Sequence, residues 1–190
     1  IVGGNNNTIM GYGAGGATTA GHSMTIIGYG AGAANLTADA LGSVFIGHSA
    51  GGLITTGEQN IAIGYQALDA LVAGDRNIAI GHGALTALAN DEIGNIAIGY
   101  LAGDSINNAG GDNNVVVGDQ AGRGGTGAMA DCVVIGGSAM TSTVSHAQTG
   151  TVAVGVSSLQ NLTTGAGNVA IGYQTLLQET TGAQNIVIGY

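Results

Sequence analysis

One short motif recurs eleven times along this chain of 190 residues: a polar residue, a bulky apolar residue, a usually small residue, a second bulky apolar residue and a glycine. Successive motif glycines, here termed the pivot glycines, lie 17 to 19 residues apart. A unit this short cannot bury a core alone, so neighbouring repeats must stack. The sequence therefore predicts one continuous all-β solenoid over residues 1–190, with about eleven turns. The pivot glycines are Gly11, Gly28, Gly47, Gly64, Gly81, Gly99, Gly118, Gly136, Gly155, Gly172 and Gly189.

The segment from Asn60 to Ile63 shows what one repeat encodes. Apolar residues alternate with a period of two, which is typical of a strand, and isoleucine is β-branched. Ile61 and Ile63 should point to one face and Ala62 to the other, and Gly64 should end the strand where a side chain would clash. These motif positions are predicted to be structural, as are the equivalent Asn77, Gly81, Asn95, Gly99, Asn168 and Gly172.

Both faces of this strand are apolar, so both must be covered. In one arrangement Ala62 fills a narrow interior, and Ile61 and Ile63 form an outward aliphatic ridge. A ridge of that length is not left in water, which predicts a subunit interface with cyclic symmetry about the rod axis. The reverse arrangement, with isoleucine inside, remains open from the sequence.

Residue preferences recur at three further positions of the repeat. Asparagine occupies seven of the eleven strand entries, and stacked copies are expected to hydrogen-bond to one another as a ladder that fixes the register. A small residue always follows the pivot by three positions, usually alanine, and predicts a second short strand that faces the first. A glycine often precedes the asparagine by three residues and predicts a turn.

The composition excludes several partners. Only 7% of the residues are charged, the two cations are Arg76 and Arg123, and the net charge is −9, so nucleic acid and anionic membrane surfaces are disfavoured. No apolar run is long enough to span a membrane, and no signal peptide is visible, as expected for a segment of a longer repeat protein. The one cysteine, Cys132, takes an asparagine position and is interpreted as a small buried substitute.

The motif Asn60-Ile61-Ala62-Ile63-Gly64 and its copies resemble the head repeats of YadA-type trimeric autotransporter adhesins. The longer version from Asn60 to Leu68 is also similar to repeats of phage tail fibres. The resemblance covers the whole chain and implies a left-handed parallel β-roll, a homotrimer around a fibre axis and a role in attachment. The repeats here are longer than YadA-type repeats, so no ligand-binding detail is carried over.

The functional expectation is therefore a non-enzymatic, extracellular structural or adhesive module of a trimeric fibre, which contacts a cell-surface glycan or protein receptor. A bacterial surface adhesin is the first hypothesis. A phage tail-fibre shaft that positions a receptor-binding tip is the alternative. An ice- or mineral-binding solenoid would need a regular threonine or aspartate array, and the threonines here cluster in only some loops.

Three motifs are typical of chemistry but fit the repeat better. Gly47-His48-Ser49-Ala50-Gly51 matches a hydrolase nucleophile elbow, and Gly11 to Gly16 matches a dinucleotide loop, yet both fill ordinary repeat positions. The acids drift between repeats, unlike those of calcium-binding β-rolls, although one loop site at Asp112 or Asp119 stays open. No catalytic residue, cofactor or metal is predicted.

The position after each pivot glycine holds all six tyrosines and two of the four histidines, His48 and His82; the others are His22 and His146. Stacked turns should align these rings in a partial aromatic stripe along the rod. The stripe either only holds register or also serves as a platform on which sugar rings lie. The candidate glycan contacts are Tyr65, His82, Tyr100 and Tyr173.

Overall fold

The computed structural model describes residues 4–16, 18–37, 40–88, 91–106, 110–124, 129–142 and 148–190. These residues form a parallel β-solenoid with turns of roughly 18 residues and contain no helix that could cross a membrane. Its main sheet has eleven strands. They are β1 (Thr8–Met10), β2 (Thr25–Ile27), β3 (Val44–Ile46), β4 (Ile61–Ile63), β5 (Ile78–Ile80), β6 (Ile96–Ile98), β7 (Val115–Val117), β9 (Val133–Ile135), β11 (Val152–Val154), β12 (Val169–Ile171) and β13 (Ile186–Ile188).

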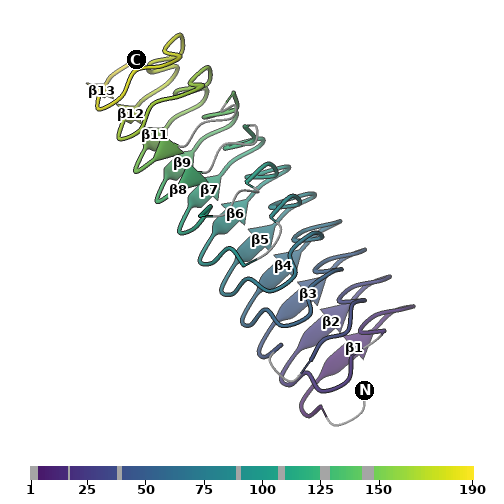
Figure 1. The fold of residues 1–190 in the computed structure, drawn as a ribbon. Coiled ribbons are helices and arrows are strands. Elements are labelled where there is room, and N and C mark those ends of the chain that lie inside the picture. The colour runs from purple at the N-terminus through teal and green to yellow at the C-terminus, as the bar shows by residue number, and fades with distance from the viewer. Residues whose placement is uncertain are drawn as a thin grey trace.

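Each strand pairs in parallel with the strand of the next turn, and equivalent residues lie side by side. Ile61 pairs with Ile78, for example, and Ala62 pairs with Ala79. The turns follow one another along a rod with the two termini at opposite ends (Figure 1). A second, two-stranded parallel sheet of β8 (Met129–Ala130) and β10 (Gln148–Thr149) forms at the corner that precedes β9 and β11. The predicted all-β repeat fold is confirmed.

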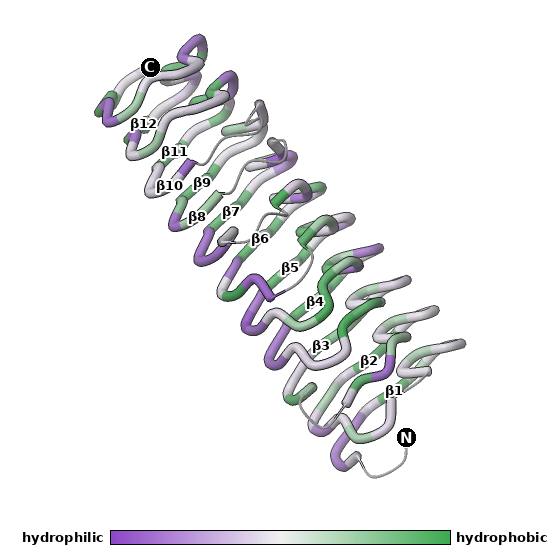
Figure 2. The backbone as a smooth tube through the Cα atoms, in the orientation of Figure 1, coloured by the Kyte–Doolittle hydropathy of each residue, from purple (hydrophilic) through white to green (hydrophobic). Residues whose placement is uncertain are grey.

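The interior is narrow and lined by the middle residues of the strands from β2 to β12 of the main sheet. Ala62 and Ala79 have no exposed surface, whereas the flanking isoleucines of β4 and β5 are only partly buried. The coil therefore holds alanine inside and presents isoleucine outside, which decides between the two arrangements left open by the sequence. Apolar residues recur along the strands, and polar residues recur along one corner of the coil (Figure 2).

The predicted second strand is wrong. The residues after each pivot glycine form turns, because the second and fourth of them have left-handed backbone angles. Gln66 and Leu68 illustrate this, with φ of 53° and 51°. The small third residue is nevertheless packed inside as expected, since Ala67 is fully buried. A strand needs extended backbone throughout, and two left-handed residues among the four after the pivot rule it out.

The pivot glycines are required for two reasons. Their φ lies between 130° and 140° from Gly11 to Gly172, a region that L side chains rarely adopt. A Cβ on Gly64 would also overlap the carbonyl oxygen of Gly81 in the next turn, and the same holds at the equivalent positions. The predicted clash at the strand end is confirmed, and the obstacle is the backbone of the neighbouring turn.

Candidate functional site

The residues that follow the first six pivot glycines form one continuous stack of rings, here termed the aromatic column. Neighbouring ring centroids lie 4.9 to 5.5 Å apart, and the first four pairs are inclined by only 16° to 22°. The pitch arises because each turn repeats the last at the strand spacing of about 4.8 Å. The column consists of Tyr12, Tyr29, His48, Tyr65, His82 and Tyr100.

Stacking determines which part of each ring a ligand can reach. Tyr65 lies between His48 at 5.1 Å and His82 at 4.9 Å, so both of its faces are covered, although 44% of the residue is exposed. His82 is likewise enclosed between Tyr65 and Tyr100. These two residues present ring edges and polar tips to solvent. The proposed platform on which sugar rings lie flat is therefore not available at Tyr65 or His82.

The column is interrupted after Tyr100. The next three positions hold Asp119, Gly137 and Val156, which together are termed the gap, and the rings resume with Tyr173 and Tyr190 at 5.4 Å. Among the described residues, Tyr100 stacks only on His82 and Tyr173 only on Tyr190. On the side of the gap, the positions next to these two tyrosines hold the side chains of Asp119 and Val156.

The backbone continues through the gap without a change of register. The amide of Gln120 donates to Tyr100 O at 2.8 Å, and the amide of Ser138 donates to Asp119 O at 2.9 Å. The same contacts recur from Ser157 to Gly137 O and from Gln174 to Val156 O, both at 2.9 Å. The interruption therefore concerns side chains alone. The sequence already predicts this partial stripe, because the residues after Gly118, Gly136 and Gly155 are not aromatic.

The expected asparagine ladder is present and holds this scaffold in register. Asn77 is fully buried, and its Oδ1 accepts from the backbone amide of Asn95 at 2.9 Å. Its Nδ2 donates to the carbonyl of Glu92 at 2.8 Å. Asn60 makes the equivalent donation to Gly74 O at 2.7 Å. One side chain thus ties two backbone groups of the next turn, and Asn60, Asn95 and Asn168 bond in the same way.

Cys132 replaces asparagine in this ladder and is fully buried, as predicted. Its Sγ donates to Gln148 O at 2.8 Å, which is the role of an asparagine Nδ2. Burial raises the pKa of the thiol to about 11, against smaller opposing effects of backbone contacts that include Thr151. The side-chain oxygens Thr151 Oγ1 and Gln148 Oε1 are buried there without a hydrogen-bond partner. The ladder is therefore less well satisfied at this turn.

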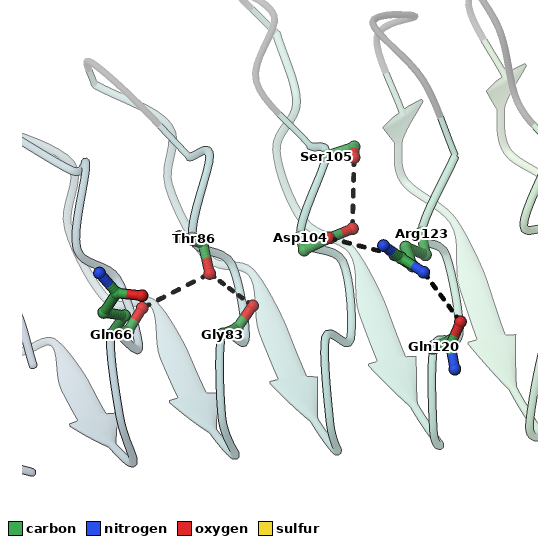
Figure 3. Close-up of polar contacts among 7 residues, drawn as sticks. All are labelled: Gln66, Gly83, Thr86, Asp104, Ser105, Gln120 and Arg123. Carbon is green, nitrogen blue, oxygen red and sulfur yellow. Dashed lines mark hydrogen bonds and ion pairs between the residues drawn. The ribbon is translucent and has the colours of Figure 1, made fainter.

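A second row of polar contacts joins turns on another side of the coil (Figure 3). Arg123 Nε lies 3.3 Å from Asp104 Oδ2, and Arg123 also donates to Gln120 Oε1 at 2.9 Å. Burial raises the pKa of Asp104, opposed by Arg123 and by the Ser105 hydroxyl. Thr86 donates to Gly83 O at 2.6 Å, within its own turn. Of these contacts, the one between Arg123 and Asp104 links adjacent turns, and none brings a reactive pair together.

The described residues contain no group of three histidine, cysteine or acidic side chains placed to hold a metal ion. His48 and His82 are two turns apart with Tyr65 between them. Asp112 Oδ1 accepts from the amide of Ile93 at 2.7 Å, so this acid caps a neighbouring turn. Ser49 lies in a turn with φ of 55°, as its repeat position dictates. His146 lies outside the described residues.

Neither the protein-family models, nor the curated proteins, nor the solved structures include a match to this chain.

Proposed function

We propose that this chain is a rod-forming segment of an extracellular homotrimeric fibre of the bacterial surface adhesin type, coiled as a left-handed β-roll and used for attachment. The handedness, the number of chains and the attachment role rest on the resemblance of the repeats to trimeric adhesin heads. The fibre character has independent support, because a parallel solenoid stacks its turns without limit along one axis.

One observation carries the proposal: the outward residues of the main sheet form two apolar columns along the rod, here termed the aliphatic face. Except for Thr8, Met10 and Thr25 at the first two strands, every position in them is valine or isoleucine. Ile98 and Ile135, in the middle of the rod, are 40% and 39% exposed. Apolar surface this continuous is typical of an interface between subunits.

A closed assembly of identical rods covers this face most simply. Each copy carries the same face along its full length, so cyclic symmetry about an axis parallel to the rods buries all copies at once. The aliphatic face contains no ionisable residue, so packing copies against one another buries no charge from this face. In this assembly the outer sides of the fibre, which include the aromatic column, contact other surfaces during attachment.

Sedimentation equilibrium tests the assembly. The chain should sediment at three times its 18.3 kDa mass. Glutamate at Ile63 and Ile80 places charge within the aliphatic face and should dissociate the assembly. The matched control places glutamate at Leu53 and Val72, which are exposed but lie off the strands, and should leave the mass unchanged. A monomeric wild-type chain, or equal behaviour of the two variants, would contradict the proposal.

A further inference from the structure

We propose that the two pairs of directly stacked tyrosines, Tyr12 with Tyr29 and Tyr173 with Tyr190, are sites of oxidative cross-linking. Each cross-link joins neighbouring turns through a carbon–carbon bond between the rings. The co-reactant is hydrogen peroxide, which a haem peroxidase uses as a one-electron oxidant. The inference goes beyond the proposed attachment function and does not depend on it, because the bond forms within one chain whatever the oligomeric state.

The stacking distance is the first argument. The ring centroids lie 5.5 Å apart in Tyr12 and Tyr29 and 5.4 Å apart in Tyr173 and Tyr190, and the planes of the first pair are inclined by only 16°. In both pairs the two residues follow paired strands of successive turns, so the parallel sheet keeps the rings side by side. Two radicals held together in this way couple within the chain, because proximity replaces an encounter between two molecules.

Exposure of the four rings is the second argument. Tyr12 and Tyr29 are 80% and 57% exposed, and Tyr173 and Tyr190 are 44% and 99% exposed. An oxidant in solution can therefore take an electron from each of these phenols. The rings also lie outside the hydrophobic core, so they can tilt into the bonded arrangement without disturbing the interior of the coil.

The other two tyrosines of the aromatic column provide an internal comparison. Tyr65 stacks on His48 and His82, and Tyr100 stacks on His82. An imidazole has no phenolic hydrogen to lose, so a radical on Tyr65 or Tyr100 has no second phenoxyl radical stacked on it within the described part of the chain. The histidines therefore confine the coupling of radicals in the column to its first two rings.

The reaction balances for each pair. Each tyrosine gives up one electron and its phenolic proton, and one hydrogen peroxide accepts both electrons and both protons to become two waters. A bond forms between two ring carbons that lie next to the hydroxyl-bearing carbons. The hydrogens on the bonded carbons then move to the oxygens and restore both hydroxyls, so the product has two hydrogens fewer than the starting chain.

Trypsin locates the bonds, because the chain contains Arg76 and Arg123 and no lysine. After oxidation of the folded chain, cleavage in denaturant gives the fragments 1–76, 77–123 and 124–190. The tyrosines of the three fragments are Tyr12, Tyr29 and Tyr65 in the first, Tyr100 in the second, and Tyr173 and Tyr190 in the third. Both predicted bonds therefore lie within single fragments.

Mass spectrometry after treatment with peroxidase and hydrogen peroxide gives the first readout. Fragments 1–76 and 124–190 should each lose two hydrogens and show dityrosine fluorescence, and fragment 77–123 should keep its mass. The bond between Tyr12 and Tyr29 closes a loop between residues 17 positions apart, which restricts the unfolded chain. The midpoint of urea denaturation should therefore shift to higher urea after cross-linking.

Two matched variants identify the partners within fragment 1–76. Tyr12→Phe removes one phenol and keeps a stacked ring, so the yield of the cross-link in this fragment should fall by at least about tenfold. Tyr65→Phe makes the same change at a ring enclosed by two histidines and should keep the yield. Oxidation of the exposed Met10 adds an oxygen and is therefore distinguished by mass.

Three results would overturn the inference. The first is that either fragment 1–76 or fragment 124–190 keeps all its hydrogens. The second is that Tyr12→Phe cross-links as well as Tyr65→Phe. The third is that the bonds join fragments of two different chains and not two rings of one chain.

Discussion

At the scale of single residues, buried asparagines convert a repeated sequence into a fixed register. A buried backbone amide or carbonyl without a partner costs about 1–3 kcal/mol. Asn77 satisfies one of each, on Asn95 and Glu92, from a position with no exposed surface. A turn displaced by one residue would lose both contacts. The ladder therefore favours one stacking register over its neighbours.

Asn77→Ala should lower the free energy of unfolding by about 3 kcal/mol, because it leaves the Asn95 amide and the Glu92 carbonyl without these partners. Urea denaturation followed by circular dichroism measures the loss. The control is Gln178→Ala at an exposed loop position, which should change stability by less than about 0.5 kcal/mol. Equal effects of the two substitutions would show that the asparagine does not carry the register.

Cys132 should make the free energy of unfolding fall at alkaline pH. Its folded-state pKa is raised to about 11, so the unfolded chain loses the thiol proton at lower pH than the folded chain does. The associated stability is fully present below about pH 9 and falls as the pH rises toward 11, by about 2 kcal/mol in total.

Comparison of the wild type with Cys132→Ala by urea denaturation at pH 8 and pH 11 isolates this dependence, because the tyrosines titrate in both proteins. The difference in stability between the two should shrink as the pH rises. A difference that stays constant across this range would mean that the thiol is not buried as described.

At the scale of strands and turns, two positions share the space inside each coil. Where the middle residue of the strand is Ala62, the fourth residue after the pivot is Leu68, and both are fully buried. Where the middle residue is Phe45, the equivalent position is Gly51, and a Cβ there would lie 2.7 Å from Phe45 Cδ1. In these two turns the interior is thus filled by one large residue of the two. The turn of β6 departs from this rule, because it has Ala97 and Gly103 at the two positions, and Ile106 and Leu85 lie next to Gly103 instead.

This complementarity predicts a rescue. Phe45→Ala should cost about 4 kcal/mol through the cavity it leaves, and Gly51→Leu should cost about 2 kcal/mol through overpacking. Combined, they reproduce the Ala62 and Leu68 pair of the next turn, and the double variant should lie within about 1 kcal/mol of the wild type. A double-mutant cycle by urea denaturation measures the coupling.

The control for this cycle combines Phe45→Ala with Gly122→Leu. Gly122 holds the equivalent position four turns away and contacts Val116, not Phe45. The two costs should therefore add without rescue. Additive costs in the Phe45 and Gly51 pair as well would show that the two positions do not share one space.

Much of the arrangement of strands and turns can be predicted from the sequence. The repeat predicts the strands, the pivot glycines and the asparagine ladder, because each depends on a local pattern that recurs in register. The turn after each pivot was harder to predict, since Leu68 and Gln66 adopt left-handed angles that leucine and glutamine rarely take. The signal was present in the glycines at the equivalent positions of other turns, such as Gly51 and Gly83.

The candidate site was predicted in part. The positions of Tyr65, His82, Tyr100 and Tyr173 follow from the repeat, and so does their alignment along the rod. Which ring faces remain free depends on stacking distances and on neighbouring side chains that differ from turn to turn. The interruption at Asp119, Gly137 and Val156 can be read from the sequence, whereas the ring spacings and inclinations come only from the structure.

At the scale of the whole molecule, the distance between two positions along the rod depends on the number of turns between them. Every proposal above depends on this geometry: the aliphatic face, the aromatic column and the gap exist only if equivalent residues of successive turns lie side by side. The central claim is therefore that the chain advances by one strand spacing, about 4.8 Å, for each turn.

Electron–electron double resonance on spin-labelled cysteines measures this advance, in a Cys132→Ala background and with labelled chains diluted among unlabelled ones. Labels at positions 29 and 100 are four turns apart, and labels at positions 29 and 173 are eight turns apart. The account predicts distances of about 19 Å and about 38 Å, so that the second is twice the first. Distances that do not scale with the number of turns would contradict the solenoid and everything inferred from it.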